Sequence, residues 1–327
     1  MAASPIGNVS ELTILIIQYL RKDLETLHSC ILVNRLFCRI TIPILWENPF
    51  SVKCRRGHRY NFFDIYFSYL NDEDKTSLSD IGIKINPSPF IKPLFNYPSF
   101  INTLSILRLE LHTDNLIYDF SKSNSHEFTF NSLREGIEAR YSTFPVLKLH
   151  PSGSKNKLIY SLLFKLFMNS NASLKKFSLF FKNSSVIFLT SEIYNMMLNN
   201  ENFISNVDKL DLWIEKRQTL PTRFLATLPS LIPSIKHLSI CANTNNTINL
   251  FIRNLIQSQA QLLSLSLYGM YSIVLLDSFK CYFNTLTLIK FDNCNFANLG
   301  EYDALKNLTQ LKSLHFNNWK GITPPFL

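Results

Sequence analysis

Large apolar residues recur along the C-terminal two-thirds of the chain in short segments of the form L-x-x-L-x-L. The six segments begin at Leu174, Val207, Ile235, Leu262, Leu286 and Leu311. Their central apolar residues are Phe177, Leu210, Leu238, Leu265, Ile289 and Leu314, which are separated by 33, 28, 27, 24 and 25 residues. Successive side chains of a strand point to opposite faces, so each segment predicts a short strand with one buried face.

Stretches with apolar residues at helical spacing lie between these strands. We predict helices over 158–169, 191–199, 222–228, 248–257 and 299–307. Over 248–257 the apolar residues form one stripe: Ile248, Phe251, Ile252, Leu255 and Ile256. One strand–helix unit cannot bury its apolar side alone, whereas stacked units share a core. Apart from the first, the spacings fall within the roughly 20–29 residues of leucine-rich repeats. We therefore predict an α/β solenoid with a parallel sheet over 158–327; the alternative is an ordinary α/β fold with similar parallel strands.

The N-terminal fifty residues carry a different pattern, which predicts three short helices. In the first, the apolar residues are Leu12, Leu15, Ile16, Tyr19 and Leu20. Ser10 and Asp23 are placed to cap the first two helices, and Asn34 to turn the chain into the third. Pro43 should kink or end the third helix. Three short helices cannot bury this much apolar surface among themselves, so we expect a partner surface.

The order of these residues resembles the F-box over roughly residues 9–50. The resemblance lies in a leading apolar helix, then "DL..L..C.LVNR.F" from Asp23 and "P.LW" from Pro43. The usual Leu-Pro opening is absent, and Val9-Ser10 stands in its place. The resemblance implies an adaptor that docks on the Skp-type linker of a cullin-based ubiquitin ligase. Similar adaptors often carry leucine-rich repeats, which capture the protein substrate.

This resemblance and the strand pattern together nominate two sets of binding residues. The expected contacts with the Skp-type linker are Leu12, Ile16, Leu27, Val33, Phe37 and Trp46, some of which must instead form the internal core of the module. The candidates for the substrate-binding face are the outward strand residues His237, Ser264, Ser266 and Lys290.

Between the two regions the pattern weakens. We interpret Leu104-Ser-Ile-Leu107-Arg-Leu109 as a degenerate first repeat, and residues 150–157 as a loop. The expected organisation is therefore an F-box-like helical module over 1–50, a linker with degenerate repeats over 51–157, and the repeat solenoid over 158–327.

The composition narrows the function further. Hydrophobic residues make up 46% of the 327 residues and charged residues 17%, which indicates a core-rich globular protein. The chain has no Gly-rich phosphate loop, no HExxH, no Cys/His cluster at zinc spacing and no G-x-S-x-G. We expect no catalytic residue, no cofactor and no metal. The alternatives are a leucine-rich-repeat scaffold outside the ubiquitin system with the helices as a cap, and an enzyme whose site the sequence does not announce.

The net charge of +9 is compatible with an acidic partner, nucleic acid or a membrane surface. The one local basic cluster spans residues 53–59, and we interpret it as a solvated loop because a charge run alone is weak support for a site. No apolar run reaches the ~20 residues that cross a bilayer, and the N-terminus lacks a signal-peptide pattern. We therefore expect a cytoplasmic or nuclear protein with no nucleic-acid or membrane partner.

Overall fold

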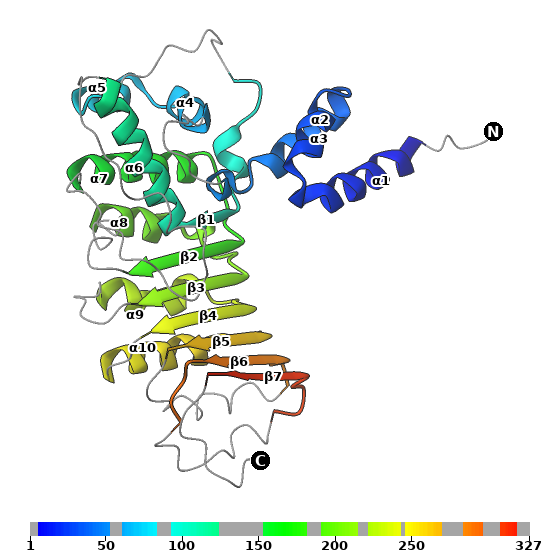
Figure 1. Cartoon of the computed structure of the whole chain (residues 1–327), viewed down its shortest axis with the longest axis vertical. Helices are drawn as coiled ribbons and strands as arrows, with labels where there is room; N and C mark the ends of the chain where they lie inside the picture. Colours follow the sequence, from blue (N-terminus) through cyan, green and yellow to red (C-terminus); the bar gives the residue numbers. More distant parts are fainter. Residues whose placement is uncertain are drawn as a thin grey trace.

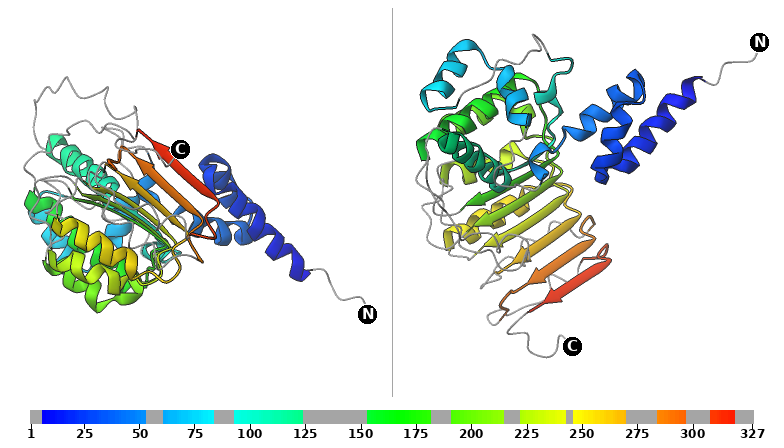
Figure 2. Two further views of the ribbon diagram at one scale, coloured as in Figure 1. Left: turned by 90° about the horizontal axis from the view of Figure 1, so that it is seen from below. Right: turned by 45° about the horizontal axis from the view of Figure 1, so that its top comes forward.

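A three-helix N-terminal module stands beside a seven-stranded sheet that carries helices along one face (Figures 1 and 2). The computed structural model describes residues 6–52, 61–83, 93–123, 153–181, 191–214, 222–242, 246–269, 284–296 and 308–318. We call the part from residue 61 onward the sheet body. The basic cluster over 53–59 and the predicted helix over 299–307 lie outside the described residues.

The sheet is parallel throughout, and its strands lie side by side in sequence order. They are β1 Thr103–Ser105, β2 Lys176–Phe181, β3 Lys209–Ile214, β4 His237–Ala242, β5 Ser264–Tyr268, β6 Leu288–Asp292 and β7 Ser313–Asn317. The register aligns all six predicted central residues, from Phe177 through Leu238 and Leu265 to Leu314. The five from Phe177 to Ile289 are buried, whereas Leu314 on the edge strand is 37% exposed. The predicted parallel α/β sheet is confirmed.

Helices cover the inner face of this sheet and close its core (Figure 1). They are α7 Gly153–Asn169, α8 Ser191–Asn199, α9 Thr222–Leu231 and α10 Asn246–Gln257, with the short η5 Glu201–Phe203 after α8. The predicted stripe from Ile248 to Ile256 is buried in full, and one connected core extends from Phe50 to Leu308. The predicted loop over 150–157 is wrong from Gly153 onward, where α7 begins. The apolar run that follows Lys157 anchors that helix.

Residues 61–83 and 93–123 belong to the sheet body and are no linker. They form α4 Asn61–Ser68, α5 Asp72–Asp80, η3 Tyr97–Phe100, β1 and α6 Ile106–Ser123. Tyr66 and Phe67 on α4 are 0% and 1% exposed and belong to the same core as the sheet. The expected linker over 51–157 is therefore corrected for its described part. The aromatic residues of 61–67 show no clear pattern in the sequence because packing partners such as Phe167 lie far along the chain.

The first repeat also has a different frame from the predicted one. Leu104 pairs with Phe177 and so occupies the central position of the motif. The motif therefore runs from Ile101 through Leu104 to Ile106, all three buried. The predicted frame from Leu104 to Leu109 is wrong because α6 begins at Ile106 and takes the later residues into a helix.

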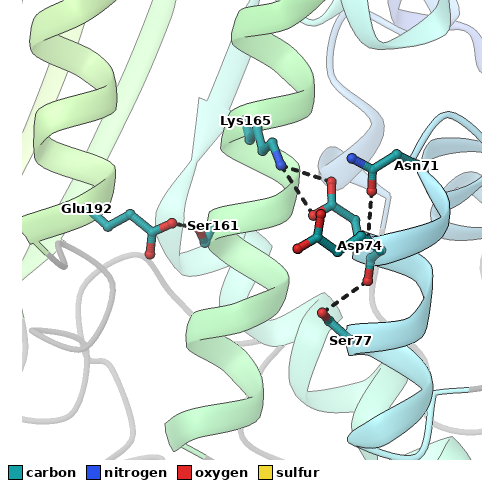
Figure 3. A network of polar contacts seen from close by, with 7 residues as sticks. Asn71, Asp74, Ser77, Ser161, Lys165 and Glu192 are labelled. Atoms are coloured by element: carbon teal, nitrogen blue, oxygen red, sulfur yellow. Dashed lines mark hydrogen bonds and ion pairs between the residues drawn. The ribbon is translucent and has the colours of Figure 1, made fainter.

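Polar side chains fix α5 against the helical layer (Figure 3). Nζ of Lys165 on α7 lies 3.1 Å from Oδ2 of Asp74 on α5. One turn earlier on α7, the hydroxyl of Ser161 donates to Oε1 of Glu192 on α8 over 2.7 Å. Asn71 caps α5 by accepting from the backbone N–H of Asp74. These contacts join α5, α7 and α8 into one layer.

The N-terminal module consists of α1 Ile6–Tyr19, η1 Leu20–Lys22, α2 Leu24–Ile31 and α3 Arg35–Leu45. Two predicted caps are confirmed: Oδ1 of Asp23 accepts from the N–H of Thr26, and Oδ1 of Asn34 accepts from the N–H of Phe37. Ser10 is no cap, because α1 already begins at Ile6. The third helix includes Pro43, whose missing N–H removes one helical hydrogen bond, and it ends two residues later at Leu45.

Candidate protein-interaction surfaces

Helix α1 is apolar on two faces, and its own module covers only one. Thr13 and Ile17 are buried, and Ile17 packs in a small core with residues of α2 and α3. The opposite stripe consists of Leu12, Leu15, Ile16 and Tyr19, which are 59%, 62%, 52% and 91% exposed. Their spacing of i, i+3, i+4 and i+7 places them on one side of the helix. A helix that is apolar all round normally has partners on every side, so this stripe is suited to a partner.

Exposed apolar side chains are concentrated in the module as a whole. Leu24, Leu32, Val33 and Leu36 are also exposed, at the start of α2 and around the turn into α3. Among the described residues, nine of the fourteen large exposed hydrophobic side chains lie in residues 12–36. Scattered exposed hydrophobic residues are normal on a protein surface, whereas such a concentration is typical of interaction surfaces. We call these nine side chains the apolar face of the module.

The six residues predicted to contact a linker separate into two groups. Leu12, Ile16 and Val33 are exposed on the apolar face. Leu27 is fully buried, where it forms the small module core with Ile17 and Cys30. Phe37 and Trp46 are partly buried: Phe37 packs against that small core, and Trp46 packs against the core of the sheet body. The side chains of Leu27, Phe37 and Trp46 therefore support the fold, and we move them out of the contact set.

Trp46 lies at the junction between the module and the sheet body. Its ring centroid is 4.4 Å from that of Tyr97 and 5.4 Å from that of Tyr66. Phe50, just beyond it, is fully buried and packs edge-on against Phe62. The module is thus joined to the sheet body through buried aromatic side chains.

Backbone hydrogen bonds show that the residues at this junction occupy the position of a repeat. In each repeat the carbonyl two residues before the central apolar position accepts two N–H groups of the next repeat. The carbonyl of Asn102, for example, accepts from Lys175 and Lys176 over 2.7 and 3.0 Å. The carbonyl of Glu47 accepts in the same way from Asn102 and Thr103, over 3.0 Å each. Residues 46–50 therefore take the place of a preceding repeat and cover the start of β1.

Two side-chain contacts hold Glu47 in that place, and the sequence reasoning missed both. Nε of Arg21 in η1 lies 3.0 Å from Oε1 of Glu47, and the amide of Asn102 donates to Oε2 over 3.1 Å. The sequence does contain one signal that residues 46–50 occupy the position of a repeat, since Trp46 and Pro49 stand at the first and fourth positions of an L-x-x-L motif. The carboxylate of Glu47 is therefore contacted by one residue of the module and one residue of the sheet body.

A buried histidine, His112, contacts the backbone just beyond the junction. Nε2 of His112 on α6 lies 3.1 Å from the carbonyl of Val52, and the His112 side chain packs against Phe50 and Phe62. His112 is 1% exposed, and this burial lowers the pKa of its imidazole. Neutral His112 therefore belongs to the folded structure at neutral pH.

The outer face of the sheet carries the predicted substrate-face residues. His237 is exposed, and Ser264, Ser266 and Lys290 are partly exposed, as strand alternation predicts. They lie on adjacent strands: Ser264 pairs with His237, and Ser266 pairs with Lys290. Nδ1 of His237 lies 2.9 Å from the hydroxyl of Ser264. The structure thus brings all four together on β4–β6.

The same face holds lysine and aromatic side chains that were not nominated. Lys176 and Lys209 precede the central residues of β2 and β3 in the same row as His237. Near the strand ends, Phe180 and Trp213 lie on neighbouring strands with ring centroids 6.0 Å apart. Outward positions of each L-x-x-L-x-L segment could have revealed them, because the register follows from the motif.

Two further findings concern possible metal and ligand sites in the described residues. Among them, no group of three or more His, Cys, Asp or Glu side chains is placed to hold a metal ion. A hollow of about 610 Å³ between the ends of α7 and α8 is lined mainly by amides, including Asn171, Asn199 and Asn202, and its one carboxylate is Glu201. Such a lining donates and accepts hydrogen bonds. In the part of the chain that the structure covers, no helix is both long and apolar enough to cross a membrane.

The apolar face of the module and the outer face of the sheet are compared with known proteins through the whole chain. No family model, no curated protein and no solved structure matches the chain.

Proposed function

We propose that the protein is a non-catalytic, substrate-recruiting adaptor of a cullin-type ubiquitin ligase. Its N-terminal module would be an F-box that binds a Skp-type linker, and its sheet body a leucine-rich-repeat solenoid that binds a protein substrate. The observation that carries the proposal is the apolar face of the module, with Leu12, Leu15, Ile16 and Tyr19 exposed on a helix whose other face is already packed. The F-box resemblance supports the identity of the partner that covers this face.

The arrangement of the junction favours this proposal over a scaffold with a helical cap. A cap would place α1–α3 over the open start of the sheet. Glu47 and the residues after it fill that place instead, and α4 and α5 add to the same end of the core. Helices α1–α3 project away from the sheet body (Figures 1 and 2). The side chains of their apolar face are exposed. A projecting module with its own small core is suited to a separate partner.

Co-purification with a Skp-type linker tests the proposal. The full chain is co-expressed with the linker as wild type, as Leu12→Asp/Ile16→Asp, and as Leu250→Asp. Leu250 on α10 is a matched control, since it is 58% exposed and Leu12 is 59% exposed. Apolar anchors dominate such interfaces, so we expect each module substitution to weaken binding by about 2 kcal/mol or more, while Leu250→Asp leaves binding unchanged.

Two results would overturn the proposal. One is a linker that is retained by Leu12→Asp/Ile16→Asp at wild-type affinity. The other is equal loss of the linker in the Leu250→Asp control, which would indicate general instability. Circular dichroism of each purified variant separates loss of binding from loss of folding, because both module positions are exposed in the unbound chain.

A further inference from the structure

Charge is distributed unevenly over the outer face of the sheet. The described strands β2–β7, with the rim residue before each, hold six lysines against three aspartates. The lysines are Lys175, Lys176, Lys209, Lys236, Lys290 and Lys312, and the aspartates are Asp208, Asp211 and Asp292. Helix α5 has the opposite balance, with four acidic residues and one lysine. The excess positive charge on the sheet face is therefore local.

Two ion pairs account for part of this charge. Nζ of Lys236 lies 3.0 Å from Oδ1 of Asp208, and Nζ of Lys176 lies 3.7 Å from Oδ2 of Asp211. The remaining four lysines have no carboxylate partner among the described residues. They form two groups: Lys175 just before β2 with Lys209 on β3, and Lys290 on β6 with Lys312 just before β7.

The strands between the two groups are nearly neutral and carry small side chains. Ser239 and Ser266 continue the row of Lys290 across β4 and β5, and His237 and Ser264 continue the row of Lys209. Next to the serines, Trp213 and Tyr268 lie in the row toward the strand ends and are partly exposed. The face thus offers a polar centre, an aromatic border and positive charge at both ends.

We infer that this face binds an extended acidic protein segment that crosses the strands, with carboxylates at two positions and neutral residues between them. The inference rests on the proposed function, since it names the class of substrate segment that the sheet would capture. Lys209 and Lys290 are three strand spacings apart across the sheet and two residues apart along the strands, which gives about 16 Å. An extended chain rises about 3.3 Å per residue, so carboxylates about four to six residues apart reach both groups.

A nucleic acid fits the same face less well. Its phosphates carry charge at every nucleotide, whereas β4 and β5 at the centre of this face hold no lysine, arginine or carboxylate, and Asp211 on β3 carries a negative charge. Carboxylates in a protein segment can be confined to the two lysine groups. An apolar side chain of the segment can then contact Trp213 or Tyr268.

Peptide selection on the intact protein tests the inference. Random twelve-residue peptides displayed on phage are selected on the full chain, and enriched peptides are synthesised with fluorescein for anisotropy. Binding is measured to wild type, to Lys209→Gln/Lys290→Gln, and to Lys75→Gln/Lys157→Gln, a control pair on α5 and α7 with the same loss of charge. We expect acidic peptides with the stated spacing, bound about tenfold more weakly by the sheet-face pair and unchanged by the control pair.

Several results would overturn the inference. They are no enriched peptide, enriched peptides without acidic residues, or equal weakening by the two double variants. A further one is a twelve-nucleotide oligouridine that binds more tightly than the peptides and loses affinity with Lys209→Gln/Lys290→Gln. Co-purification of the Skp-type linker is measured on the same proteins. Peptide binding without linker binding refutes only the proposed function, and linker binding without peptide binding refutes only this inference.

Discussion

Truncation of Leu265 to alanine measures how much one position of the stacked core contributes. Leu265 is fully buried and lies between Leu238 and Ile289 on the adjacent strands, which are also buried. Removal of three carbon atoms at about 0.8 kcal/mol each costs roughly 2.4 kcal/mol of transfer free energy. The cavity adds to this cost because neighbouring strands hold the walls apart. We therefore expect the free energy of unfolding to fall by about 3–4 kcal/mol.

Leu314 provides a control of the same chemistry in the same row of the sheet. It aligns with Ile289 on the last described strand and is 37% exposed. Leu314→Ala removes the same atoms from a site that leaves no enclosed cavity, so the expected cost is about 1 kcal/mol. The difference between the two substitutions should therefore be at least about 1.5 kcal/mol, on the same cavity argument.

Calorimetry and hydrogen exchange together read out this difference. Calorimetry gives the melting temperature of each variant, and exchange of the β4–β6 amides gives local opening, which matters because stacked repeats do not always unfold in one step. We expect Leu265→Ala to lower the melting temperature more than Leu314→Ala and to speed exchange on the neighbouring strands. Equal effects of the two substitutions would refute the reasoning from the parallel register.

Two other expectations concern the junction. Trp46→Ala should reduce the free energy of unfolding of the chain by roughly 2–3 kcal/mol in the absence of any partner, because the Trp46 ring packs on Tyr97. The melting temperature should fall accordingly. An unchanged melting temperature with reduced linker binding would return Trp46 to the set of linker contacts. Burial lowers the pKa of His112, so the unfolded chain takes up a proton that the folded protein does not. The unfolding free energy from urea titrations should therefore fall as pH drops below about 6.5, and His112→Gln should reduce that fall; an identical pH dependence in the variant would contradict the argument.

The strands of the sheet could be predicted from the sequence because their signal is local. Each L-x-x-L-x-L segment fixes its own inward residues, and the stacking of Leu238, Leu265 and Ile289 follows from repetition alone. The first repeat was placed in the wrong frame because Leu107 and Leu109, which continue the motif in the sequence, belong to α6. There the helical and strand patterns overlap, and pattern alone does not decide between them.

The module shows a second limit of sequence reasoning. Helix α1 has apolar residues on two faces, so periodicity does not tell which face its own module covers. The structure assigns Ile17 to the inside and Ile16 to the outside, although the two are neighbours in an apolar run. Trp46 was assigned to a partner because its place depends on Tyr97, which lies in a different part of the chain. Such non-local contacts leave no local pattern.

The junction has a consequence for an adaptor. In the adaptor proposed above, a flexible connection would spread the position of a bound substrate relative to the linker over many places. Here the chain leaves α3 and enters the hydrogen-bond ladder of the sheet within two residues, at Glu47. Arg21 from the module and Asn102 from the sheet body both contact its carboxylate. Since the backbone of Glu47 replaces a repeat, the apolar face and the outer sheet face are held in one orientation by the same ladder that stacks the strands.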